Sequence, residues 1–74
     1  MKTLEELRTE ENMTLRELSV RSLVPYVKLH KIENGLYTPT VTEKDNIAIS
    51  LGVEAENINW FVKKESANNA EFQS

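Results

Sequence analysis

Hydrophobic and polar residues follow one another along this chain with the spacing of short helices. No segment shows the strict apolar–polar alternation of a half-buried strand. Apolar residues instead recur three or four positions apart, as they do on the buried face of a helix. The positions with this spacing are Leu4, Leu7, Leu15, Leu18, Leu29, Ile32, Val41, Ile47, Ala48 and Leu51. The pattern predicts an all-α fold.

Helix boundaries are marked by capping boxes, in which a threonine is followed three residues later by a glutamate. The hydroxyl and the carboxylate of this motif satisfy free backbone N–H groups at a helix start. The three copies are Thr3/Glu6, Thr14/Glu17 and Thr40/Glu43. Pro25 suits the first position of another helix, and Asn34-Gly35 and Gly52 suit helix ends. With a further short helix or turn from about Ala55, we expect five short helices.

These helices are expected to form one domain over residues 1–62. A chain of 74 residues buries only about 60% of its extended surface, which allows a single compact core. The apolar residues near the end of this range suit that core, or the seam of a homodimer; they are Ile58, Trp60, Phe61 and Val62. Residues 63–74 carry almost nothing to bury, and we expect a disordered tail there.

Composition narrows the class of protein. The absence of cysteine excludes a disulfide framework and a thiolate metal site, and His30 is the only histidine, so no metal or cofactor is expected. No apolar run reaches the ~20 residues that span a bilayer, and the acidic start is unlike a signal peptide. We expect a cytoplasmic protein without membrane contact. An enzyme acting on a small molecule is not expected, since a domain of this size offers little of the cleft that catalytic carboxylates need.

The charge distribution is uneven. The net charge is −3, from nine basic and twelve acidic residues. Residues 14–38 have four basic and two acidic side chains, a net charge of +2, between two flanks that are net acidic. This basic segment is either a solvated helix surface or a phosphate-contacting one. Its cations are Arg16, Arg21, Lys28 and Lys31.

Five segments in this order and spacing resemble the Cro/CI type of helix-turn-helix proteins, the phage-repressor family. They are T-L-R-E-L (14–18), L-V-P (23–25), L-H-K-I-E-N-G (29–35), T-P (38–39) and I-A-I-S-L-G-V (47–53). The resemblance covers about residues 3–60 and implies a lambda-repressor-like domain whose third helix lies in the DNA major groove. It also implies a structural ion pair between Arg8 and Glu33; the alternative is two solvated charges.

The resemblance fails where relatives contact DNA. Leu15 replaces a phosphate-contacting glutamine, Leu23 a turn glycine and Pro25 a capping serine or threonine. Tyr26 and Val27 stand where relatives carry base-reading side chains. At about 100° per residue, one face of this helix is expected to meet the core and another to point outward. The predicted core face holds Pro25, Leu29, Ile32 and Leu36, and the outward face Leu23, Tyr26, Val27, His30 and Asn34.

Two functions follow from this outward face. An exposed apolar cluster favours a protein contact, so the chain is expected to bind a phage repressor's N-terminal domain as an antirepressor in the bacterial cytoplasm. The alternative is a Cro-like repressor that dimerises and reads operator DNA, with thymine methyls as targets of the apolar side chains. An antitoxin of the same fold is a third option. A separate alternative for Tyr26 and Val27 is that they pack against neighbouring helices and have no binding role. The expected contact residues are Arg16, Arg21, Tyr26, Val27, Lys28, His30, Lys31 and Asn34.

Overall fold

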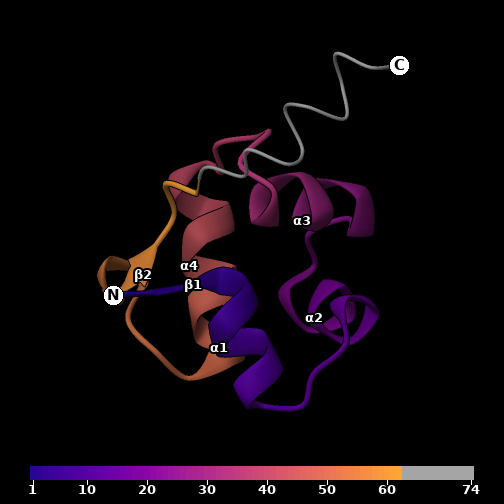
Figure 1. Ribbon diagram of the computed structural model, residues 1–74. Helices are drawn as coiled ribbons and strands as arrows, with labels where there is room; N and C mark the ends of the chain where they lie inside the picture. The colour runs from indigo at the N-terminus through magenta and orange to yellow at the C-terminus, as the bar shows by residue number, and fades with distance from the viewer. Residues whose placement is uncertain (63–74) are drawn as a thin grey trace, which may run out of the picture.

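The computed structural model describes residues 1–62, and these form a mostly helical domain (Figure 1). Its four α-helices are α1 (Leu4–Glu10), α2 (Leu15–Ser22), α3 (Tyr26–Glu33) and α4 (Val41–Leu51). A 3₁₀ helix, η1 (Ala55–Asn57), takes the place of the expected fifth helix. The tail predicted at residues 63–74 lies outside the described residues. Within the described part, no helix has the length and apolar character needed to span a bilayer.

Two very short strands were not expected from the sequence. β1 (Lys2–Thr3) pairs in parallel with β2 (Ile58–Asn59), with Lys2 opposite Ile58. Each strand has two residues, which is too short for an apolar–polar alternation to be recognised. The pair brings the start of the chain beside residues that follow η1, at the left of Figure 1.

All three predicted capping boxes are present. In each, the threonine hydroxyl accepts a hydrogen bond from the backbone N–H of the glutamate, and that carboxylate accepts one from the threonine N–H. Pro25, however, precedes α3 and does not begin it, because its ψ of 144° is extended. α3 therefore starts at Tyr26 without a side-chain cap.

The predicted helix ends at Gly35 and Gly52 are confirmed by left-handed backbone conformations, with φ of 74° and 72°. At Gly35 a second constraint acts, since a Cβ atom there would collide with the backbone carbonyl of Val62. This glycine therefore ends α3 and lets the segment after β2 pass close by.

The core lies between α1, α2, α3 and α4. α2 makes the most extensive contacts, with α4 and then with α3. The buried apolar residues are Leu4, Met13, Leu18, Val24, Leu29, Ile32, Ile47, Ala48, Leu51 and Ile58. Burying side chains of this size stabilises the fold by roughly 1.5–3 kcal/mol each.

Three expected core residues are exposed. Leu36 follows Gly35, where the chain leaves the helix, so the helical spacing no longer predicts its direction. Pro25 is exposed because it precedes the first turn of α3. Val41 is the first residue of α4 and is 74% exposed. For Pro25 and Leu36 the periodicity was extended past the ends of α3, whereas Val41 lies within α4, in its first turn.

Candidate interaction surface

The predicted ion pair between Arg8 and Glu33 is present and joins α1 to α3. The Arg8 Nε donates to Glu33 Oε2 at 2.7 Å, and a second guanidinium nitrogen donates to Oε1 at 3.2 Å. The third nitrogen donates to the backbone carbonyl of Met13 at 2.9 Å. Because the charge-assisted bond to Glu33 favours the protonated form, the pKa of Arg8 is raised. The pair fixes the carboxyl end of α3, leaving its other face for contacts.

A second ion pair on α3 was missed by the sequence analysis. The Lys28 ammonium donates to Glu43 Oε2 at 2.9 Å, and the Tyr37 hydroxyl donates to Glu43 Oε1 at 2.9 Å. Lys28 also lies 5.2 Å from the centre of the Tyr37 ring. The capping bond from the Thr40 backbone and the bond from Lys28 together lower the pKa of Glu43 to about 2. No residue spacing signals this cluster, because its members come from α3, the loop and α4.

Two predicted contact residues have partners within the domain. The Lys28 ammonium is paired with Glu43 while 44% of its side chain is exposed, and a phosphate contact by Lys28 stays a prediction. The Asn34 side-chain nitrogen donates to the backbone carbonyl of His30 at 2.8 Å and closes the helix end, and its contact role also stays a prediction.

An exposed apolar group remains at the start of α3 and the end of α2. Leu23 is 84% exposed, Val27 62% and Tyr26 45%. Val20, one helical turn before Leu23, is exposed as well. The sequence does give a signal for it, because its spacing from Leu18 and Ser22, which are buried, places it on another face of α2; this signal was missed. We name these four residues the α2–α3 surface.

Cations border the α2–α3 surface. The Arg16 guanidinium lies 5.6 Å from the centre of the Tyr26 ring, a cation–π contact that links the two helices. Arg21 and Lys31 are exposed. None of these three forms an ion pair with a carboxylate among residues 1–62. His30 is exposed one turn after Tyr26 and Val27. The structure thus joins Arg16 to Tyr26 and leaves Arg21 and Lys31 exposed on the same two helices.

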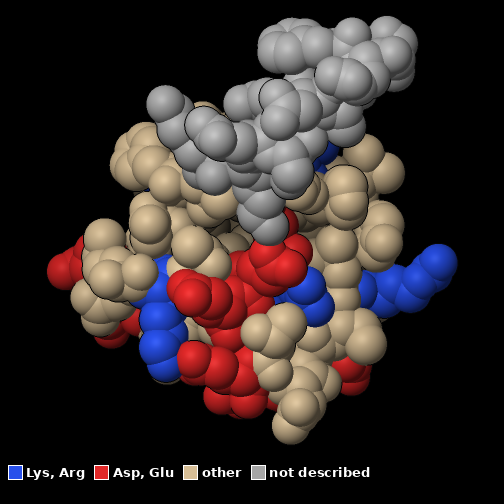
Figure 2. All heavy atoms as spheres, viewed as in Figure 1, with Lys and Arg blue, Asp and Glu red and all other residues tan. Residues whose placement is uncertain are grey.

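Acidic side chains gather elsewhere, over α1 on the face turned to the viewer in Figure 2. The acidic residues of α1 and the turn after it are Glu5, Glu6, Glu10 and Glu11. The molecule therefore has an acidic face on α1 and an apolar, cation-bordered surface on α2 and α3.

Residues 1–62 hold no group of three or more His, Cys, Asp or Glu placed to bind a metal ion. Every buried side-chain polar atom in this part of the chain has a hydrogen-bond partner. The α2–α3 surface is the candidate site that the described residues offer, because its apolar side chains are exposed. No protein-family model, no curated protein and no solved structure matches this chain. Its function is inferred from its residues and their geometry.

Proposed function

We propose that this chain is a phage-type switch protein of the helix-turn-helix class, acting in the bacterial cytoplasm as an antirepressor. In this proposal α2 and α3 are the helix-turn-helix pair, and the α2–α3 surface binds the N-terminal domain of a partner repressor. The observation that carries the proposal is the exposure of Tyr26 and Val27 where a DNA-reading protein would place hydrogen-bonding side chains. Leu23, where such a protein would have a turn glycine, is exposed as well.

Leu23 gives the strongest support. It ends α2 in the left-handed conformation, with φ of 62°, which costs a non-glycine residue about 1 kcal/mol. Its side chain is also 84% exposed, so packing within this domain does not offset that cost. A glycine would serve the backbone better, and a polar residue would suit the exposure better. A leucine is favourable there if a partner covers it.

Tyr26 is suited to the centre of such a contact. Aromatic residues dominate interface energetics because a large ring is ordered at low entropic cost and its hydroxyl finds a polar partner. The cation–π contact with Arg16 restricts the ring before binding. Less conformational entropy is then lost when the partner docks.

The acidic face of α1 supports a repressor as the partner. A DNA-binding domain carries cations for the phosphate backbone. Glutamates on α1 would attract such a domain over several ångströms and speed the encounter at low salt. The same negative charge would repel the phosphates of DNA.

DNA binding is the second candidate, and one observation favours it. Arg16, Arg21 and Lys31 lack carboxylate partners in the described part of the chain and would anchor phosphates. Lys28, the fourth predicted cation, is paired with Glu43 and would exchange that carboxylate for a phosphate. Tyr26 and Val27 would then contact thymine methyls.

The two candidates are separated by titrating the full chain, in parallel, into operator duplex and into the N-terminal domain of the repressor from the same phage. The antirepressor proposal expects a stoichiometric protein complex and no sequence-selective DNA complex. Tight DNA binding that weakens steeply with added salt, without a protein complex, would establish the Cro-like alternative instead.

A matched pair of variants ties the result to the α2–α3 surface. Val27→Asp should weaken the complex at least tenfold, about 1.4 kcal/mol, because a carboxylate is buried against the partner. Ile49→Asp makes the same kind of change at an aliphatic residue of α4 that is 76% exposed. It should leave the dissociation constant within about twofold. Equal losses in both variants would show that the contact lies elsewhere.

A further inference from the structure

The carboxyl end of α3 is followed by Gly35, so that Asn34 and Gly35 form an asparagine–glycine pair, which occurs nowhere else in the sequence. Such a pair is chemically labile, because the glycine nitrogen can attack the asparagine side chain. Glycine has no Cβ atom to shield its nitrogen and rotates freely into the geometry of attack. Gly35 is exposed and Asn34 is partly exposed, so solvent reaches both groups.

The reaction open to this pair is an intramolecular deamidation. The Gly35 backbone nitrogen loses its proton to a solvent base and forms a bond to Cγ of Asn34. The bond between Cγ and Nδ2 breaks, and Nδ2 takes up a proton from water and leaves as ammonia. Water then opens the cyclic imide at Cγ, which gives aspartate, or at the backbone carbonyl carbon, which gives isoaspartate. The overall change consumes one water molecule and releases one ammonia molecule.

Three features of the folded chain oppose ring closure. The Asn34 Nδ2 donates to the backbone carbonyl of His30 at 2.8 Å, which directs the leaving group back along α3. The Gly35 N–H donates to the backbone carbonyl of Ile32 at 3.2 Å, which keeps the proton on the attacking nitrogen. The ψ angle of Asn34 is 8°, so the Gly35 nitrogen eclipses the Asn34 nitrogen, whereas ring closure needs it to eclipse the Asn34 Cβ.

These restraints belong to one closed helix end. The Gly35 N–H bonds to Ile32 and the Leu36 N–H bonds to the Lys31 carbonyl at 2.8 Å, which together form a Schellman motif. The motif requires the left-handed φ of 74° at Gly35. The backbone carbonyl of Val62 lies where a Cβ atom of this glycine would be, so a shift of the turn is opposed from that side as well.

We infer that Asn34 is a site of covalent modification, which the closed end of α3 protects and which reacts when that end opens. Helix ends open at a lower free energy than the whole domain, so the reaction does not need global unfolding. Aspartate has no N–H to donate to His30 and adds a negative charge at the negative end of the helix dipole. Isoaspartate lengthens the backbone by a methylene group and displaces Gly35 from its place beside Val62. Each product therefore weakens the turn that protected the asparagine, and the modification is one-way.

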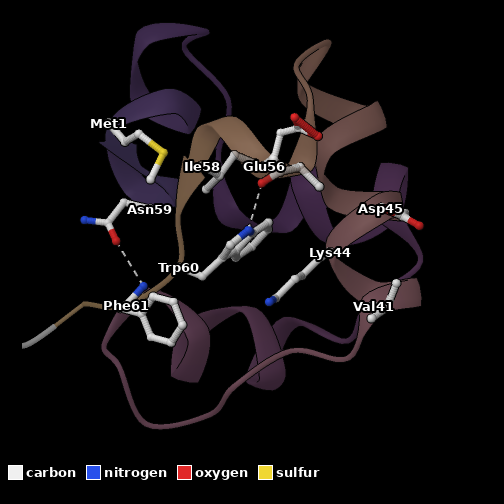
Figure 3. A pocket seen from close by; sticks show the side chains of 10 residues that line it. Met1, Val41, Lys44, Asp45, Glu56, Ile58, Asn59, Trp60 and Phe61 are labelled. Carbon is white, nitrogen blue, oxygen red and sulfur yellow. Dashed lines mark hydrogen bonds between the residues drawn. The ribbon is translucent and has the colours of Figure 1, made fainter.

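Other asparagines of the chain provide internal references. Asn59 is partly exposed, but its neighbour is Trp60, and its Oδ1 accepts a hydrogen bond from the Phe61 N–H at 3.1 Å (Figure 3). A side chain on the following residue hinders access to the attacking nitrogen and restricts its backbone rotation. The asparagines within residues 1–62 that precede such a residue are Asn12, Asn46, Asn57 and Asn59.

Peptide mass spectrometry of the full chain, aged at mildly alkaline pH and sampled over time, tests the inference. In guanidinium chloride, Asn34 should convert before any other asparagine of the chain, and faster as the pH rises, because the attacking nitrogen must lose a proton. In native buffer at the same pH and temperature, its conversion should be at least tenfold slower, which corresponds to an opening free energy of about 1.4 kcal/mol.

Asn34→Gln is the matched control. Its longer side chain keeps an amide that can donate to His30, but ring closure would form a six-membered imide, which is much slower. No conversion at position 34 is expected over the same period in either solvent. Asn34→Asp reproduces one product and should lower the folding equilibrium constant by about fivefold, since a hydrogen bond is lost and a charge opposes the dipole.

Equal rates of conversion at Asn34 in the folded and the unfolded chain would overturn the inference, since the helix end would then give no protection. Earlier conversion of another asparagine in the unfolded chain would overturn it as well. An Asn34→Asp protein as stable as the unaltered chain would contradict the weakening of the turn by its product. These measurements need neither a repressor nor DNA, so their outcome is separate from that of the proposed function.

Discussion

The two faces of α3 differ in whether contacts within the domain account for the side chains that they carry. On the inner face, Leu29 and Ile32 are fully buried and Glu33 is held by Arg8. On the outer face, Tyr26 and Val27 are exposed, and the ring of Tyr26 contacts the Arg16 guanidinium. Contacts within the domain thus account for the side chains on one face of this eight-residue helix and not for those on the other. A binding function can be argued from the exposed side chains of that other face.

The largest effect is expected on the inner face, for Arg8→Ala. Glu33 has only 6% of its side chain exposed, so removal of the guanidinium leaves a buried carboxylate without its counter-charge. Such a loss costs about 3 kcal/mol of unfolding free energy. Urea denaturation followed by circular dichroism measures it.

Glu33→Gln is the control for that experiment. The amide keeps an acceptor for Arg8, and the guanidinium retains its bond to the Met13 carbonyl. The expected cost is therefore only about 1 kcal/mol. If both variants lost less than about 0.5 kcal/mol, the pair would be behaving as two solvated charges.

Local signals in the sequence predicted the parts of the fold that depend on near neighbours. A capping box needs only a threonine and a glutamate three residues apart, and all three were found. The Arg8–Glu33 pair came from a resemblance to a known family and is present. The parallel pair of Lys2–Thr3 with Ile58–Asn59 joins residues more than 50 positions apart, and nothing in either dipeptide signals the other.

The candidate surface was predicted only in part, for the same reason. The outward direction of Tyr26 and Val27 follows from helical spacing, and the structure confirms it. The pairing of Lys28 depends on Glu43, fifteen residues later, to which the sequence alone assigns only a capping role. One carboxylate accepts bonds from Thr40, Tyr37 and Lys28, and only the three-dimensional arrangement reveals this.

That carboxylate gives the second prediction, an effect that depends on pH. The pKa of Glu43 is about 2 in the folded chain and 4.5 ordinarily, so the unfolded state binds a proton more readily. The stabilisation is complete above pH 4.5 and is lost as the pH falls toward 2. The expected contribution is about 2 kcal/mol, reduced from the full shift because solvent screens the half-exposed Lys28.

Glu43→Gln isolates this contribution. Glutamine also completes a capping box, so the start of α4 is kept while the charge is removed. The difference in unfolding free energy between the two proteins should be largest at pH 7 and should shrink steadily below pH 4.5. A difference that stays constant down to about pH 2 would mean that the charge of Glu43 does not stabilise the fold.

The smallest effect is expected on the outer face of α3, for Tyr26→Ala and Val27→Asp. Both residues are exposed, and α3 has no acidic residue in its first turn, so an aspartate there gains from the positive end of the helix dipole. The unfolding free energy should change by less than about 0.5 kcal/mol in Val27→Asp and by about 0.5 kcal/mol in Tyr26→Ala, where the contact with Arg16 is lost. Leu29→Ala, on the inner face, should cost about 3 kcal/mol in the same urea titration. Comparable losses on both faces would mean that Tyr26 and Val27 are held by the domain itself, and the case for a partner on α2 and α3 would then fail.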